Sequence, residues 1–341
     1  MAETNVAYAS SDDILESLVL HTIPDFGKHG DGIINQNLLL AYLKSKGTSK
    51  SFKVKDGGLE IWKGVRTRQS TNFKWQGKSD TMTTNEQDPD QRMRFDWKTF
   101  TGSVILNALD KARNKGRAAI KDFALELREQ AEDTILNQFN SSFWKSSPGS
   151  DEPQSVPALV SATPTAGTVG GQTRSTSKAF QNGAVTTTIT DIGSESGIKA
   201  MKQAQIRQTI RANDSVDLII MDESNYSGLV GFLSTQNRFQ PNDKLAQLGI
   251  KTIMLDSTTI GFENRNLTDD TDNTITDGYV YGLNSNHLTF EVLKDGNFMW
   301  NPDGFERVGA TLNKALYFWV FCNLVTNLPK AHFVMTDVST A

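Results

Sequence analysis

Apolar residues recur every three or four positions between residues 117 and 145, and charged residues fill most positions between them. The apolar positions are Ile120, Phe123, Ala124, Leu127, Ala131, Ile135 and Phe139. This spacing predicts a single amphipathic helix that ends before Pro148 and Gly149. At about 1.5 Å per residue the helix is roughly 40 Å long, which exceeds most helices of globular domains.

A pattern with a period of two precedes this helix. Residues 59–66 form a strand-like stretch after two glycines, and Met93, Phe95 and Trp97 alternate with charged residues. The polar tract 77–91 separates the two stretches, so we expect an extended β-hairpin over residues 56–100. Because an isolated hairpin is marginal in water, it needs a surface to lie on, and a neighbouring chain is the favoured source.

The second half of the chain changes character. Residues 216–221 form a continuous apolar strand, Asp222 or Ser224 then caps a helix to about residue 236, and a second strand covers residues 250–255. This succession of strand, helix and strand predicts an α/β domain with a central sheet. After an acidic loop at residues 263–277 the chain becomes rich in strands. Residues 1–35 are mixed, and a helix that places Leu38, Leu39, Tyr42 and Leu43 on one face follows and ends at Gly47. The start of the chain, residues 1–55, therefore indicates an arm that lies over another surface.

Charge limits the class of partner. The 341 residues carry 35 basic and 39 acidic side chains, which gives a formal net charge of −4. A protein that wraps nucleic acid tightly needs an excess of Lys and Arg, because phosphates must be neutralised. We therefore expect any contact with nucleic acid to be local or weak.

A single cysteine, Cys322, lies in an apolar run and is interpreted as a small buried hydrophobic residue. One cysteine forms no internal disulfide, so no oxidising compartment is indicated. The first residues lack the basic and apolar regions of a secretory signal, and the longest apolar run, residues 315–325, is too short for a membrane helix. The expected place of synthesis and assembly is the cytoplasm.

Searches for catalytic and metal-binding motifs find no catalytic residue, no cofactor site and no metal site. Residues 193–197 (Gly-Ser-Glu-Ser-Gly) only resemble a nucleophile elbow, and the four histidines lack metal-ligand spacing. Asp269, Asp270, Asp272 and Asp277 are better explained as a solvated acidic loop than as a calcium site. The sequence therefore predicts a protein that is not an enzyme.

The order of several segments resembles the major capsid proteins of tailed bacteriophages, which share the Hong Kong 97-type fold. Residues 57–62 resemble the opening of the extended loop of that family, and residues 95–97 with 103–106 resemble its return strand. Residues 114–116 and the following helix resemble its long spine helix. Residues 169–174 with 180–182, residues 217–220 with Tyr226, and residues 281–288 resemble later segments of that fold.

The resemblance implies an α+β fold with five parts. These are an N-terminal arm (1–55), an extended β-hairpin loop (56–100), a first peripheral part with the spine helix (101–150), an axial α/β domain (151–283) and a second peripheral part (284–341). It further implies a structural subunit of the virion that assembles in the host bacterial cytoplasm. Subunits of that family form pentamers and hexamers that tile an icosahedral shell around packaged double-stranded DNA.

The partners that follow from the resemblance are other copies of the chain, with portal, scaffolding or cement proteins as further candidates, and non-specific contact with the packaged DNA; no membrane is involved. Two other classes of protein stay open. One is a phage tail, decoration or surface adhesin protein, which the β-rich C-terminal part suits. The other is an α/β enzyme that uses Asp217, Asp222 and Glu223, although acids at strand ends are usually helix caps.

Opposite charges on two predicted elements suggest where subunits meet. The hairpin is basic and the long helix is acidic, so we expect the hairpin of one subunit to lie across the helix of its neighbour. The simpler alternative is that the charged faces of both elements are exposed to solvent and contact no other subunit. The candidate contact residues are Lys63, Arg66, Arg68, Lys74 and Lys78 on the hairpin, and Glu126, Glu129, Glu132 and Asp133 on the helix.

Overall fold

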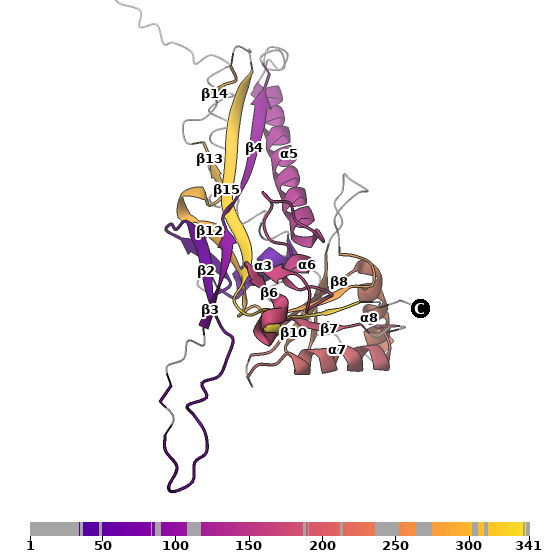
Figure 1. The fold of residues 1–341 in the computed structure, drawn as a ribbon. Coiled ribbons are helices and arrows are strands. Elements are labelled where there is room, and N and C mark those ends of the chain that lie inside the picture. The colour runs from indigo at the N-terminus through magenta and orange to yellow at the C-terminus, as the bar shows by residue number, and fades with distance from the viewer. Residues whose placement is uncertain are drawn as a thin grey trace, which may run out of the picture.

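The computed structural model describes residues 34, 37–47, 50–82, 84–85, 90–107, 117–186, 189, 191–211, 214–235, 252–263, 275–301, 306–309, 313–336 and 338, with the backbone alone for 117–125 and 128. Within these residues, the strands form two six-stranded sheets and two two-stranded sheets. Figure 1 shows the first sheet rising beside helix α5 and the second sheet beside it at the lower right. We call them the long sheet and the short sheet.

Helix α5 (Arg117–Trp144) confirms the predicted long helix to within one residue. Its described apolar side chains point at the long sheet, and Ile135, Phe139 and Phe143 are buried. Phe139 lies 5.1 Å from the ring of Phe100, and Phe143 lies 5.8 Å from the ring of Phe290. Each buried aromatic side chain contributes about 1.5–3 kcal/mol by leaving water, so this face holds the helix on the sheet.

The long sheet is built around β15 (Lys314–Thr326). β15 pairs antiparallel with β4 (Lys98–Leu106) from Cys322 opposite Lys98 to Lys314 opposite Leu106. On its other edge it pairs with β12 (Leu288–Leu293), β13 (Met299–Trp300) and β14 (Glu306–Arg307). β1 (Phe52–Lys55) completes the sheet by parallel pairing with β12.

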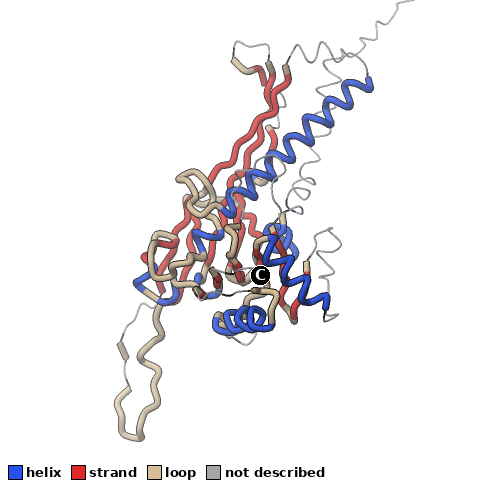
Figure 2. Tube along the Cα trace, turned by 90° about the vertical axis from the view of Figure 1, so that its right-hand side faces the viewer, coloured by secondary structure: helices blue, strands red, loops and turns tan. Residues whose placement is uncertain are grey.

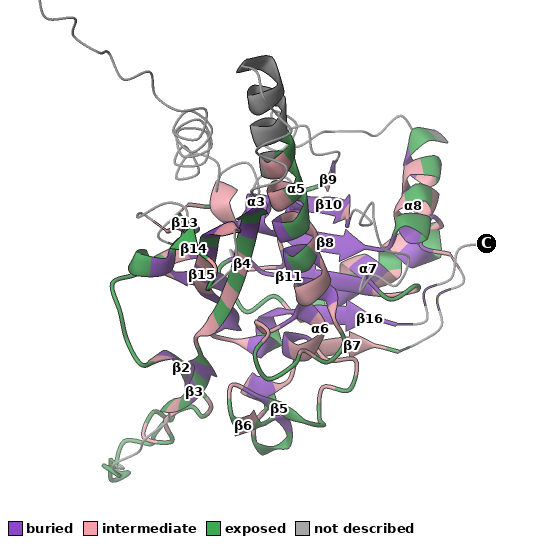
Figure 3. Ribbon diagram, turned by 90° about the horizontal axis from the view of Figure 1, so that it is seen from above, coloured by how far each residue is buried: buried purple, intermediate pink, exposed green. Residues whose placement is uncertain are grey.

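The short sheet has the order β7-β16-β11-β8-β10-β9. Its strands are β7 (Gly183–Val185), β8 (Leu218–Met221), β9 (Ile253–Leu255), β10 (Thr258–Phe262), β11 (Val280–Leu283) and β16 (Phe333–Met335). Helices α7 (Glu195–Arg207) and α8 (Glu223–Thr235) pack on it through Met201 and Leu229, both buried. Seen from above, these strands form a buried centre, and α8 exposes its outer face (Figure 3). The predicted strand at 216–221 and the helix after it are confirmed.

The two sheets share residues from both ends of the chain. Helix α3 (Leu38–Ser45) begins at Asn37, whose side chain accepts a hydrogen bond from the backbone nitrogen of Leu40 at 2.9 Å. Leu39, Leu40 and Leu43 on this helix are fully buried in the main core. The expectation of an arm over residues 1–55 therefore does not hold for α3, whose residues 38–43 are buried in the core of this chain; residues 1–33, 35–36 and 48–49 lie outside the described part.

Strands β2 (Glu60–Arg66) and β3 (Asp90–Asp96) form the predicted hairpin, paired from Glu60 opposite Asp96 to Arg66 opposite Asp90. Their inner face, with Val65 and Met93, is buried on this same chain. The support comes from a short hairpin made of β5 (Thr168–Val169) and β6 (Gln172–Thr173), where the Gly170 carbonyl accepts a 2.9 Å hydrogen bond from the Arg94 nitrogen.

Gly170 is required at this contact. It has φ +53°, and a Cβ there would lie 2.6 Å from the Cβ of Met93. The strands of the extended hairpin therefore rest on their own chain, and only the connection between them projects. Figures 1 and 2 show this connection leaving the body as a long loop.

Residues 146–186, which are rich in small polar residues, are built around a buried arginine. The Arg174 guanidinium donates to the carbonyls of Ala158, Leu159 and Phe180 and to the side chain of Asn182, at 2.8–3.1 Å. Burial lowers its pKa to about 10. The remaining short helices are α6 (Val156–Leu159), η1 (Arg174–Thr176), η2 (Lys178–Phe180), η3 (Lys294–Gly296) and η4 (Pro329–Ala331).

Candidate subunit-interaction site

Lys63 does not face solvent as the sequence analysis expected. Its ammonium group forms an ion pair with Glu291 of β12, and the two side chains are only 11% and 1% exposed. Burial lowers the pKa of Lys63, and the Glu291 carboxylate opposes that shift. Lys63 therefore fixes the hairpin to the long sheet of its own chain and is not available to a neighbour.

The other four candidate cations of the hairpin are exposed. Arg66 lies 3.5 Å from Asp90 across the hairpin, and this exposed pair contributes little. Arg68, Lys74 and Lys78 lie on the projecting loop. The loop also carries two aromatic side chains that the sequence analysis missed, Phe73 and Trp75, which are 89% and 104% exposed. Two aromatic residues just before the polar tract 77–91 were the available signal.

Three of the four acidic candidates on α5 are exposed to solvent, as the sequence analysis expected. Glu126, Glu129 and Asp133 are exposed, whereas Glu132 is half-buried. Figures 1 and 2 show the projecting loop and the N-terminal half of α5 extending in opposite directions from the body. A contact between the two charged sets within one chain is thereby excluded, and a contact between copies stays a prediction.

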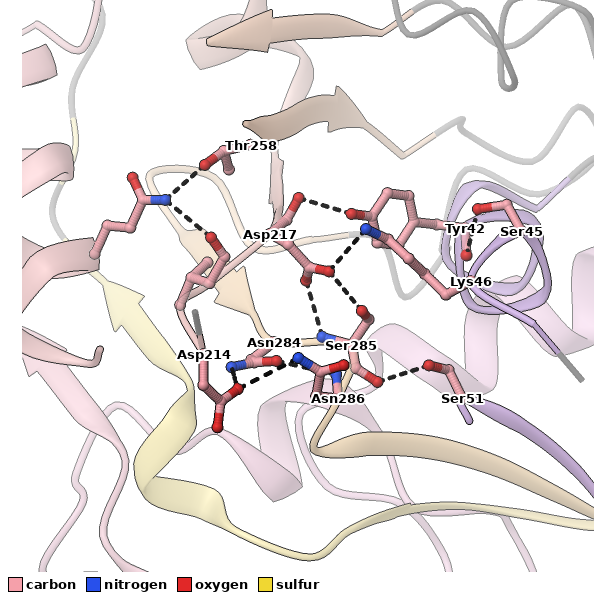
Figure 4. A network of polar contacts seen from close by, with 12 residues as sticks. Tyr42, Ser45, Lys46, Ser51, Asp214, Asp217, Thr258, Asn284, Ser285 and Asn286 are labelled. Carbon is pink, nitrogen blue, oxygen red and sulfur yellow. Dashed lines mark hydrogen bonds and ion pairs between the residues drawn. The ribbon is translucent and has the colours of Figure 1, made fainter. Parts of the chain in front are cut away.

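A network of polar contacts joins the two sheets where the chain passes from β11 to β12 (Figure 4). Asp217, just before β8, accepts hydrogen bonds from the backbone nitrogen and the hydroxyl of Ser285, and pairs with Lys46 at 3.1 Å. The hydroxyl of Tyr42 donates to the Asp217 carbonyl at 2.9 Å. Asp217 is therefore a structural carboxylate that connects α3, β8 and this passage.

Asp214 supports the same passage from its other side. It accepts a 2.8 Å hydrogen bond from Asn284 and lies 2.7 Å from Nε2 of His287. Partial burial alone would raise the pKa of Asp214, but the hydrogen bonds from His287 and Asn284 outweigh it and lower the pKa. The other ring nitrogen of His287 lies 2.7 Å from the side-chain oxygen of Asn327, on the return passage from β15 to β16.

His332 completes the junction and is fully buried. Its Nδ1 accepts from the backbone nitrogen of Asn284 at 3.1 Å, so in the neutral ring Nε2 carries the proton and donates to the Thr326 hydroxyl, also at 3.1 Å. Burial lowers its pKa to about 3, with a further lowering from His287 and an opposing effect from Asp214. The sequence analysis treated His287 and His332 as scattered, because their separation along the chain hides that both lie at this junction.

The residues that were considered as catalytic groups of an α/β enzyme form hydrogen bonds within this chain. Asp222 accepts from the backbone nitrogen of Asn225 at 3.3 Å and so caps α8, as the sequence indicated. Ser194 caps α7 by accepting from the Gly197 nitrogen at 3.1 Å, which explains the motif that resembles a nucleophile elbow. Within the described residues, no group of three or more acidic, His or Cys side chains is placed to hold a metal ion. Asp269, Asp270 and Asp272 lie outside those residues.

Burial raises the pKa of the Cys322 thiol to about 12, in agreement with its interpretation as a buried hydrophobic residue. None of the helices in the described ranges has the length and apolar character needed to span a bilayer.

No protein-family model and no curated protein sequence matches the chain. Solved structures do. The Cyanophage A-1(L) capsid asymmetric unit is similar over 84% of this chain and 89% of that chain, with a TM-score of 0.57 and 11% identity. The chain has the Hong Kong 97-type capsid fold. The capsid of Myoviridae Phage XM1 is similar over 83% and 88% of the two chains (TM-score 0.52, 12% identity), and the capsid of an empty GTA particle over 83% and 92% (TM-score 0.51, 11% identity).

In the terms of the capsid fold, the long sheet with α5 is the peripheral domain and the short sheet with α7 and α8 is the axial domain. The predicted assignment of residues 284–341 to the peripheral domain is wrong at its end. β16 (Phe333–Met335) pairs with β11 and β7 in the axial sheet. The capsid fold thus crosses between its domains at residues 284–287 and 327–332, and the junction network ties both crossings together.

Proposed function

We propose that the chain is the major capsid protein of a tailed bacteriophage, a structural subunit of the icosahedral shell that encloses packaged DNA. The observation that carries the proposal is the capsid fold, similar to phage capsid chains over more than four fifths of its length. A loop with fully exposed aromatic side chains supports it, because such residues in a soluble protein usually belong to an interface.

In this proposal the principal partner is the chain itself, in pentamers and hexamers. Portal, scaffolding and cement proteins complete the particle, and the packaged double-stranded DNA makes non-specific contact with the inner surface. The net charge of −4 fits a weak contact of this kind. The subunit assembles in the cytoplasm of the host bacterium and ends in the virion.

The structural role also fits the way in which the carboxylates are used. Asp214, Asp217 and Asp222 accept hydrogen bonds from side chains and backbone of the same chain. A carboxylate that serves as a general base needs a free lone pair directed at a substrate. This arrangement favours the capsid subunit over the α/β enzyme.

Size-exclusion chromatography over a range of protein concentrations, with and without a crowding agent, tests the proposal. A capsid subunit moves to discrete assemblies of five or six chains or to particles in the void volume. An elution position of a monomer under all these conditions contradicts it.

We further propose that the exposed loop cations of one subunit face the acidic stripe of α5 in another. Arg68, Lys74 and Lys78 supply the positive charge, and Glu126, Glu129 and Asp133 supply the negative charge. Single exposed pairs contribute roughly 0–1 kcal/mol, so the effect comes from repetition through a symmetric shell. Arg66 is a weaker candidate because Asp90 already pairs with it, and Glu132 because it is half-buried.

Charge reversal tests this contact. The variant K74E/K78E should assemble poorly, and adding E126K/E129K should restore assembly, because the pairs are then re-formed with exchanged signs. The variant K199E/R207E, with both changes at exposed positions of α7, alters the net charge by the same amount and is the matched control. Normal assembly of K74E/K78E with unchanged salt dependence would eliminate the contact.

A further inference from the structure

The ring of His287 connects both crossings between the two sheets. His287 lies in the first crossing, and its Nδ1 is 2.7 Å from the side-chain oxygen of Asn327 in the second crossing. Its Nε2 is 2.7 Å from a carboxylate oxygen of Asp214, in the segment before β8. The backbone nitrogen of Asn327 also donates to the His287 carbonyl at 3.1 Å. One imidazole ring thus joins both crossings to the axial sheet.

The two atoms that face the ring nitrogens of His287 are both hydrogen-bond acceptors. A carboxylate and an amide oxygen have no hydrogen to donate. A neutral imidazole carries one N–H, so it satisfies one of the two oxygens and turns a lone pair toward the other. An imidazolium carries an N–H on each nitrogen and satisfies both. The contacts to Asp214 and Asn327 together therefore specify a doubly protonated ring.

The carboxylate of Asp214 has no other cation beside it. It accepts hydrogen bonds from the side chains of Asn284 at 2.8 Å and Asn286 at 3.4 Å (Figure 4), and no Lys or Arg of the described residues forms an ion pair with it. The side chains of Asp214 and His287 are 21% and 17% exposed, so water screens their attraction only in part. A negative charge in this setting favours the imidazolium form of its neighbour.

His332 is held in the opposite state. It lies in the second crossing, and its Nδ1 accepts from the backbone nitrogen of Asn284 in the first. Burial keeps the His332 ring neutral, and the positive charge of His287 opposes its protonation further. Asp214 and His332 are the titratable groups of the described residues that face His287. One charged and one neutral histidine thus link the same two crossings.

We propose that His287 is a pH-sensitive link between the axial and peripheral sheets, closed while its ring carries two protons and loosened when the ring loses one. After that loss the remaining proton stays on Nε2, because the charged carboxylate of Asp214 is a stronger acceptor than an amide. The oxygen of Asn327 then faces a bare nitrogen and moves away, so the second crossing loses its side-chain tie to the first.

The direction of the pH effect follows from proton linkage. An unfolded histidine titrates at about pH 6.5, whereas the folded chain holds this proton to higher pH. The stabilisation by the link is therefore complete below about pH 6.5 and is lost as the pH rises above it. His332 acts in the reverse direction, because its burial costs stability at acid pH. The two crossings are thus held most firmly near neutral pH.

Nuclear magnetic resonance of the full chain, with its histidine ring nitrogens labelled with ¹⁵N, tests the link directly between pH 5 and pH 9. His287→Asn and His332→Asn assign the two signals. Asp214→Asn should lower the pH midpoint of the His287 signal by about one unit or more, a tenfold loss of proton affinity. Lys330→Gln is the matched control, because it removes an exposed charge from the second crossing without touching His287 and should leave the midpoint unchanged.

We expect both nitrogens of His287 to be protonated at pH 6. Backbone hydrogen exchange at residues 327–332, corrected for its intrinsic dependence on pH, should become about tenfold faster at pH 9, along the titration of the ring. A ring with one proton at pH 6, a midpoint that Asp214→Asn leaves in place, or exchange that does not follow the titration would each overturn the link. This inference is independent of the proposed function, which stands under any of these outcomes.

Discussion

The carboxylate of Asp217 accepts a hydrogen bond from the backbone nitrogen of Ser285 at 2.9 Å and a second one from the Ser285 hydroxyl. Asp217 lies at the start of β8 in the axial sheet, and Ser285 lies on the crossing to β12 in the peripheral sheet. Ser51, just before β1, donates to the Ser285 carbonyl at 2.7 Å. Asp217 and Ser285 thus link the two sheets at this crossing, together with Ser51.

Replacing Asp217 with Ala should lower the free energy of unfolding by about 1–3 kcal/mol, because the buried nitrogen of Ser285 loses its acceptor. Asp217→Asn keeps one acceptor oxygen and should lose less. Urea denaturation of dissociated subunits measures both variants. Equal stability of Asp217→Ala and wild type would show that the crossing is held by other contacts.

His332 should make stability depend on pH. Its pKa is lowered from 6.5 to about 3, so below pH 6.5 the unfolded chain binds a proton that the folded chain does not. The free energy of unfolding should therefore fall by about 2 kcal/mol between pH 7 and pH 5 from this group. The titratable neighbours on the facing segments are Asp214 and His287. The lowered pKa of Asp214 acts in the same direction, with its stabilisation lost only below about pH 3.8.

His332→Asn removes this titration and keeps a side-chain oxygen near the Asn284 nitrogen. The difference in stability between wild type and His332→Asn should shrink as the pH falls from 7 to 5. A difference that is constant over this range would mean that His332 does not stay neutral in the folded chain.

The buried pair of Lys63 and Glu291 should show strong coupling. Lys63→Met leaves the 1% exposed Glu291 carboxylate without its cation and should cost about 3–5 kcal/mol. The double variant K63M/E291L should recover most of the loss, because no unpaired charge remains. A double-mutant cycle in urea measures the coupling, and additive effects of the two changes would contradict the pairing.

Gly282 and Phe333 form a close cross-strand contact in the axial sheet. They are paired between β11 and β16, and a Cβ on Gly282 would lie 2.1 Å from the Phe333 ring. Gly282→Ala should therefore destabilise the fold by about 1–3 kcal/mol through overpacking. Phe333→Leu in the same chain should partly relieve the clash, which thermal unfolding can test. Destabilisation that is the same with either residue at position 333 would argue against this contact as the cause.

The elements that the sequence predicted are those whose pattern is local. The period of α5 and the alternation at Met93 and Phe95 depend on neighbours a few residues away, so they can be recognised from one chain. Asp222 as the cap of α8 is of the same kind. The order of these elements carried the resemblance to the capsid fold.

The features that were missed depend on contacts between distant segments. Lys63 appeared to be one more surface cation because Glu291 is 228 residues away. His287 and His332 come close to each other only because the chain crosses twice between its sheets. The burial of α3 likewise depends on a core assembled from both ends of the chain. Phe73 and Trp75 can be recognised in the sequence, but their exposure to solvent could not be predicted from it.

Negative-stain electron microscopy of the purified, assembled protein tests the central claim most directly. The account predicts closed shells, partial shells, or rings with fivefold and sixfold symmetry. A uniform field of single 37.7 kDa particles at high concentration and with crowding agent would contradict it.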